Sequence, residues 1–146
     1  MRQYYIAGNW KMHKTVSEAV ALAKSLVAQL EGCTETVMIA PPFTALAAVG
    51  EAIRGSKILL GAQNMGPELQ GAHTGEVSAA MLRDLGVTAV ILGHSERRHS
   101  YGEPDALINR KVLLALEQGL LPILCVGETL EEREAGRLED VVGTQV

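Results

Sequence analysis

Short apolar runs alternate with longer stretches of helical periodicity along the whole chain. Five runs have the composition of strands: YYIAG, TVMIA, KILLGA, TAVILG and LPILCVG. The stretch after each run repeats its apolar residues at steps of three and four, as in a helix that buries one face. Because these strands are apolar on both faces and helices separate them, the pattern predicts an α/β fold. Its parallel sheet would be covered by helices on the outer side.

Start and stop signals place the helices between these runs. Thr15 and Glu18 have the spacing of a capping box in front of the first helix, and Gly32 ends that helix. The later helices are expected over residues 44–53, 78–85 and 105–118, and after Thr129.

Polar side chains follow glycine at the ends of four of the five strands, in IAGNWK, LLGAQN, ILGHSE and CVGETLEE. Glycine permits a tight turn and leaves room for a ligand. The strands of a parallel sheet all end at the same edge, so side chains that are distant in sequence should meet on one rim. They are Asn9, Lys11, Gln63, Asn64, His94, Glu96 and Glu128. Barrels and open sheets of the α/β class carry their chemistry at this rim.

Composition narrows the classes of partner. The chain has 146 residues, of which 47% are hydrophobic and 21% charged, which indicates a globular protein with one domain at most over residues 1–146. Its net charge of -4 argues against binding nucleic acid or an anionic membrane. Cys33 and Cys125 form no metal-binding pattern, and no apolar run resembles a signal peptide or a membrane span. We therefore expect a cytoplasmic protein without a metal site.

Four segments resemble a known family in their order and spacing: AGNWKMHKT, GAQNM with GAHTGEVSAAMLRDLG, ILGHSERR, and VGETLEERE. They are similar to the signature segments of triosephosphate isomerase, and GNWK and GHSERR are the most specific of them. The resemblance implies a TIM (β/α)8 barrel and a homodimer. It also implies interconversion of dihydroxyacetone phosphate and glyceraldehyde 3-phosphate, a reaction of glycolysis and gluconeogenesis that needs no metal or organic cofactor.

The repeat spacing of about thirty residues would need eight units to complete such a barrel. The fifth unit is reached near Val146, so we expect a partial barrel of about five parallel strands. By the resemblance, the glutamate base on the sixth strand, the lid and the phosphate loops would lie outside residues 1–146. Two hypotheses remain open. The chain is either part of an isomerase that is inactive alone, or a catalytically silent half-barrel that only associates with itself or with a complementary half.

The resemblance also implies roles at the rim. Lys11 would hold the phosphorylated triose and offset charge on an enediolate oxygen, and Asn9 would donate to that oxygen or bond its own turn. His94, kept neutral by a helix start that Ser95 would cap, would donate to the substrate carbonyl, a device known from this family itself. Glu96 would position Lys11, relay a proton, or merely favour the helix start. On the residues alone, a solvated lysine at Lys11 and a structural histidine at His94 would be the more frequent cases.

The segment Met65–Val77 is too long for a simple connection between a strand and a helix. In the family the matching loop docks beside the active site of the partner subunit, and Thr74 would be its tip. The remaining residues expected at this dimer interface are Gln63, Asn64 and Arg97. Arg97, Arg98 and His99 would be scaffold residues that pair with acidic neighbours at the dimer face rather than bind phosphate. Without the resemblance, a self-packed surface loop would be the simpler interpretation.

Overall fold

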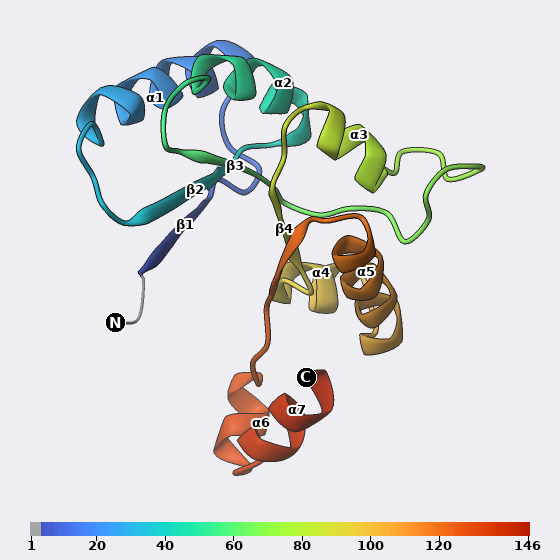
Figure 1. Cartoon of the computed structure of the whole chain (residues 1–146). Helices are drawn as coiled ribbons and strands as arrows, with labels where there is room; N and C mark the ends of the chain where they lie inside the picture. Colours follow the sequence, from blue (N-terminus) through green and yellow to red (C-terminus); the bar gives the residue numbers. More distant parts are fainter. Residues whose placement is uncertain (1–3) are drawn as a thin grey trace.

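The computed structural model describes residues 4–146. Its strands are β1 (Tyr5–Asn9), β2 (Thr36–Ala40), β3 (Leu59–Ala62), β4 (Ala89–Leu92) and β5 (Leu121–Leu124). Its helices are α1 (Val16–Gln29), α2 (Phe43–Ala52), α3 (Ala79–Asp84), α4 (Ser95–Ser100), α5 (Asp105–Glu117), α6 (Leu130–Glu134) and α7 (Leu138–Gln145). The strands form one parallel sheet in the order β1-β2-β3-β4-β5. Figure 1 shows this sheet curling into a half-barrel, with α1, α2 and α5 outside it. The predicted fold class is confirmed.

Alternation along the strands builds two apolar clusters, because successive side chains point to opposite faces. Leu60 of β3 and Val90 of β4 face the helices and pack with Leu46, Val49 and Leu82 in the larger cluster. The smaller cluster lies on the inner face of the curl and contains Met38, Ala40, Ala89 and Ile91. Burying a leucine or valine side chain contributes roughly 1.5–3 kcal/mol, so the larger cluster dominates the stability of the fold.

The predicted helix starts are present. The Glu18 carboxylate accepts a hydrogen bond from the Thr15 backbone N–H at 2.8 Å. At the start of α3, the Ser78 hydroxyl accepts the Met81 N–H at 3.3 Å. Thr129 and Glu132 form a further capping box in front of α6. Helices α2, α3 and α5 agree with their expected ranges to within one residue at each end.

The last two helices lie beyond the carboxyl end of β5 (Figure 1). Neither α6 nor α7 has a buried residue among those described. The Gln145 side chain ties α7 back to the sheet by accepting the Gly127 N–H at 2.7 Å and donating to the Gly127 carbonyl at 3.1 Å. Across residues 4–146, every helix is too short or too polar to cross a bilayer.

Candidate active site

Most of the predicted rim residues line one cavity of about 240 Å³ at the carboxyl ends of the strands. The rim cavity is lined by Asn9, Lys11, Met12, Phe43, Gln63, Asn64, His94, Glu96, Arg97 and Tyr101. Glu128 is not among the residues that line it, and its carboxylate pairs with Arg133 at 3.2 Å. The structure therefore brings together six of the seven side chains that the strand ends predicted.

Lys11 and Glu96 form an ion pair across the rim cavity, with 2.8 Å between Nζ and Oε1. Their hydrogen bond lowers the pKa of the Glu96 carboxyl, so this side chain is ionised at neutral pH. The two residues lie 85 positions apart, and the pair forms only because β1 and β4 end at the same edge. Of the roles open for Glu96, positioning the Lys11 ammonium is the one that this contact favours.

The backbone at Lys11 is held in an unusual conformation, with φ at 52°. Its N–H donates to Asn9 Oδ1 at 2.9 Å, and its carbonyl accepts from Gln63 Nε2, also at 2.9 Å. The same Gln63 amide donates to the Ala40 carbonyl at 2.8 Å, which ties the turn to the end of β2. A conformation of this kind persists only where its surroundings fix it, and here they do so from both sides. The Asn9 oxygen accepts the hydrogen bond of the turn, so its amide nitrogen is the group that this side chain can offer to a ligand.

His94 is the N-cap of α4, and the expectation that Ser95 would cap this helix is wrong. The His94 ring replaces the serine hydroxyl, because its Nδ1 accepts the Glu96 backbone N–H at 3.2 Å. Glu96 Oε2 lies further from the same nitrogen, at 3.4 Å, and the Glu96 carboxylate is already paired with the Lys11 ammonium. An Nδ1 that accepts a hydrogen bond carries no proton, so a neutral ring bears its proton on Nε2. That N–H is the donor that the ring can offer to a ligand.

A buried charged network supports the rim cavity from behind, and the sequence did not predict it. Lys111 on α5 is 2% exposed, and its Nζ donates to Asn64 Oδ1 at 3.1 Å and to Glu103 Oε1 at 2.7 Å. Arg97 Nε donates to the same Glu103 oxygen at 2.6 Å. Burial by itself would raise the pKa of Glu103, but the hydrogen bonds from Lys111 and Arg97 outweigh it and lower that pKa. A signal was present, since Ile108, Lys111 and Ala115 share one helix face that is otherwise apolar.

The arginines of α4 pair with acidic neighbours within this chain, whereas their predicted place at a dimer face stays a prediction. Arg97 binds Glu103, and its guanidinium also lies over the Tyr101 ring, 4.9 Å from the centroid. Arg98 pairs with Asp105 at 2.5 Å and donates to the carbonyls of Gly93 at 2.6 Å and Cys125 at 3.1 Å. These contacts anchor the helix that follows His94. The part of Arg97 in a dimer interface stays a prediction.

The segment 65–77 lies between β3 and α3 (Figure 1), and it is buried at Met65 and exposed over residues 69–76. A hydrogen bond of 2.8 Å from the Gly66 N–H to the Val77 carbonyl closes its base, and Glu68 pairs with Arg110 of α5. Thr74 lies on the exposed part of the segment. The segment is therefore fixed at its base, with its tip available for contact.

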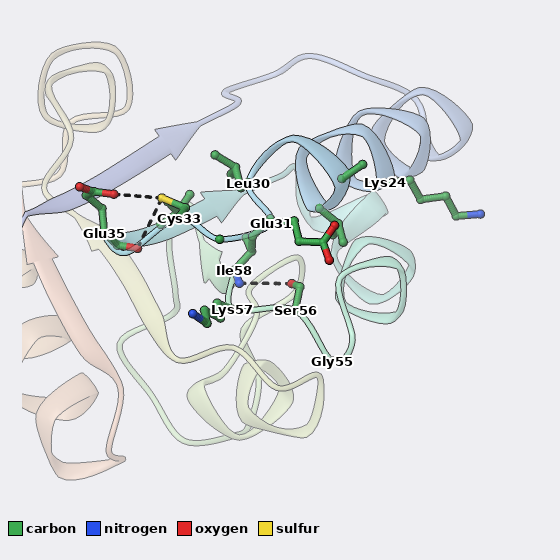
Figure 2. A pocket seen from close by; sticks show the side chains of 13 residues that line it. Lys24, Leu30, Glu31, Cys33, Glu35, Gly55, Ser56, Lys57 and Ile58 are labelled. Atoms are coloured by element: carbon green, nitrogen blue, oxygen red, sulfur yellow. Dashed lines mark hydrogen bonds between the residues drawn. The ribbon is translucent and has the colours of Figure 1, made fainter.

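A larger cavity of about 410 Å³ opens at the opposite end of the sheet, where residues 30–35 and 55–58 lead into β2 and β3. In Figure 2, Cys33 points toward Glu35, and Lys24 points away from the cavity. The Cys33 thiol donates to Glu35 Oε2 at 3.2 Å, and the Ser56 hydroxyl accepts the Ile58 N–H at 3.2 Å. These polar contacts are local ones. We place the candidate site at the rim, because among residues 4–146 a histidine, an ion pair and a carboxamide converge only there.

The rim has no group of side chains suited to a metal. Among residues 4–146 no three His, Cys, Asp or Glu side chains cluster in a way that could hold an ion. The donors at the rim cavity include the Lys11 ammonium, the His94 ring and the Asn9 amide. Such donors suit a small anionic ligand that carries a carbonyl group.

Five βα units that curl around a polar rim define the fold as part of a (β/α)8 barrel, a class in which the strand ends carry the chemistry. The family model described as triosephosphate isomerase matches residues 4–146. The triosephosphate isomerase of Treponema pallidum (strain Nichols) is 65% identical over all of this chain and 59% of that relative. The Treponema denticola enzyme of the same name is 59% identical, with 58% of it covered.

A solved structure agrees with these matches. The crystal structure of triosephosphate isomerase from Bartonella henselae superimposes with a TM-score of 0.91 at 41% identity, covering 97% of this chain and 59% of that one. The chain belongs to the triosephosphate isomerase family. It spans about 59% of the length of the relatives it matches.

Proposed function

We propose that residues 1–146 carry the electrophilic half of a site that interconverts dihydroxyacetone phosphate and glyceraldehyde 3-phosphate. The observation that carries this proposal is the Lys11–Glu96 ion pair beside a His94 ring whose Nδ1 is an acceptor. Family membership supports the reaction and a phosphorylated triose as the substrate.

Each side chain has a separate task in the reaction. The His94 Nε2–H donates to the substrate carbonyl, and the Lys11 ammonium offsets the charge that develops on the enediolate oxygen. Glu96 fixes the ammonium, and Asn9 offers its amide nitrogen to the same oxygen. Because these donors are already held in place by the protein, they need little reorganisation when the charge develops.

The proton on carbon needs a base that these residues do not supply. Of the carboxylates that follow the strands, Glu96 is bound to Lys11 and Glu128 to Arg133. We therefore assign the base to the part of the relatives that this chain does not cover. The base would take the proton from one carbon of the triose and return it to the neighbouring carbon. His94 would meanwhile donate its hydrogen bond to the substrate oxygens.

We also propose that the complete barrel is a homodimer in which Thr74 reaches the rim cavity of the partner. Three large side chains beside the cavity support this arrangement, because Met12, Phe43 and Tyr101 are all exposed in this chain. Met12 is 92% exposed, as is typical of an apolar side chain that belongs to an interaction surface. Gln63 and Asn64 would act on the interface only indirectly, by supporting the turn at Lys11. The cytoplasmic setting and the absence of nucleic-acid and membrane partners stay predictions.

The test compares residues 1–146 alone with the completed protein, in which the uncovered part of the Treponema pallidum relative is added as a fused or separate polypeptide. A coupled assay should find little isomerisation by residues 1–146, because general base catalysis contributes about a hundred- to ten-thousandfold. The completed protein should be active, and Lys11→Ala and His94→Ala should each abolish most of that activity. Turnover by residues 1–146 alone that both substitutions abolish would refute our assignment of the base.

The second candidate is a catalytically silent half-barrel that associates with itself. Apolar side chains on the outermost strands support it, since Ile6 of β1 and Leu121 of β5 are each about half exposed. The same assay separates the candidates. A completed protein that is folded but inactive would favour the silent half-barrel.

A further inference from the structure

A lysine buried in the outer layer connects two segments that support the candidate site. Lys111 is 2% exposed, and a buried ammonium is costly unless it is paired and hydrogen-bonded. Its Nζ donates to Asn64 Oδ1 and to Glu103 Oε1, on two segments that both lead to the rim cavity. Lys111 does not line that cavity itself.

The first arm runs from Lys111 through Asn64 to Lys11. Asn64 is 8% exposed and directly follows Gln63, whose amide holds the Lys11 carbonyl at 2.9 Å and the Ala40 carbonyl at 2.8 Å. The turn at Lys11 has a positive φ, so it depends on this clamp. By fixing Asn64, Lys111 fixes the residue pair that keeps Lys11 in place.

The second arm runs from Lys111 through Glu103 to α4. Glu103 Oε1 accepts hydrogen bonds from both Lys111 and Arg97, and the Glu103 N–H donates to the Arg97 carbonyl at 3.1 Å. Arg97 directly follows Glu96, the partner of Lys11, on the helix that His94 caps. The two arms therefore meet at the Lys11–Glu96 ion pair at one end and at Lys111 at the other.

We propose that Lys111 is a positioning residue that holds Lys11 and the His94 helix in one arrangement, an inference that rests on the proposed isomerase function. Its two hydrogen bonds fix the positions of Asn64 and Glu103 relative to each other. Loss of the ammonium would therefore remove a constraint from both segments at once. Displacement of a reacting group by about 1 Å can cost a hundredfold in rate, even when the change lies far from the chemistry. The effect should fall on kcat, because the donors must match the transition state more closely than the bound substrate.

The test uses the completed protein with Lys111→Met, which keeps the length of the side chain and removes its charge. Arg110→Met is the matched control, because Arg110 is the preceding residue of α5 and binds loop residue Glu68 at the surface. The double variant Glu103→Gln/Lys111→Met removes the buried carboxylate together with the ammonium. It should therefore fold even if the single variant does not. Backbone hydrogen exchange of residues 9–12 is followed alongside the kinetics.

We expect Lys111→Met to lower kcat about 10- to 100-fold with little change in KM, and to speed exchange at residues 9–12. Arg110→Met should change neither. The double variant should regain stability and keep the lowered kcat and the fast exchange, because Asn64 still lacks its donor. Normal kcat and exchange in the double variant, or equal effects of Lys111→Met and Arg110→Met, would overturn the proposal. If the unaltered completed protein is inactive, the proposed function fails, and the exchange comparison still decides the role of Lys111.

Discussion

The two ends of the sheet differ in how far apart in sequence their polar partners lie. At the carboxyl ends of the strands, Lys11 binds Glu96 across 85 positions and Lys111 binds Asn64 across 47. At the amino ends, Cys33 binds Glu35 two positions away and Arg54 binds Glu51 three positions away (Figure 2 shows the first of these contacts). Both ends belong to the same strands, so the difference comes from the side chains that follow or precede those strands.

This difference explains why the smaller cavity is the better candidate site. Partners that are far apart in sequence meet only when the sheet has formed, and each then constrains the other's segment. The cavity at the amino ends is larger, but its polar groups satisfy their own turns. A substitution at the rim should disturb several segments, whereas one at the amino ends should stay local.

The largest contrast is expected for two carboxylates. Glu103→Gln at the rim leaves the buried Lys111 ammonium without its counter-ion, which should cost about 3 kcal/mol of unfolding free energy at neutral pH. Glu51→Gln at the amino ends removes an ion pair that solvent already screens, and should change stability little. Urea denaturation of both variants of the completed protein measures the difference. Similar losses in the two variants would contradict the contrast.

The loss in Glu103→Gln should depend on pH in a defined direction. Burial would raise the pKa of Glu103, but its hydrogen bonds outweigh burial and lower that pKa in the folded protein. The carboxylate therefore stabilises the fold fully above the ordinary glutamate pKa of about 4.3, and this contribution disappears as the pH falls through the lowered value. The stability difference between the unaltered protein and the variant should be constant near neutrality and shrink in acid. A difference that grows toward low pH would contradict this assignment.

A smaller contrast is expected for two glycines that share a left-handed backbone. Gly93 at the rim has φ of 68°, and a Cβ there would lie 2.9 Å from Arg98 Nη2 and 3.2 Å from the Cys125 carbonyl oxygen. Gly55 at the amino ends has φ of 81°, and nothing would lie within 4 Å of its Cβ. Gly55→Ala should cost about 1 kcal/mol for the backbone alone, and Gly93→Ala about 2–3 kcal/mol because crowding adds to it. Equal midpoints of thermal unfolding would show that the rim is no more constrained.

The strands and most of the rim could be predicted from the sequence, because apolar period and strand-end glycines are local signals, whereas the partial barrel was expected from the family resemblance. The capping residue of α4 was predicted wrongly, since serine is a much commoner N-cap than histidine and the ring of His94 took its place. The partnership of Lys111 with Asn64 and Glu103 could not be predicted. A lysine on an apolar helix face signals burial, but it does not say which distant segments supply its partners.

The central proposal is that His94 faces the substrate as a neutral donor. The most direct test is a ¹⁵N NMR measurement of the His94 ring in the completed protein at neutral pH, with the exposed loop residue His73 as the reference. We predict an unprotonated Nδ1 that is hydrogen-bonded to the Glu96 N–H, and a proton on Nε2. Protons on both ring nitrogens, with Nδ1 donating to the Glu96 carboxylate 3.4 Å away, would contradict the account.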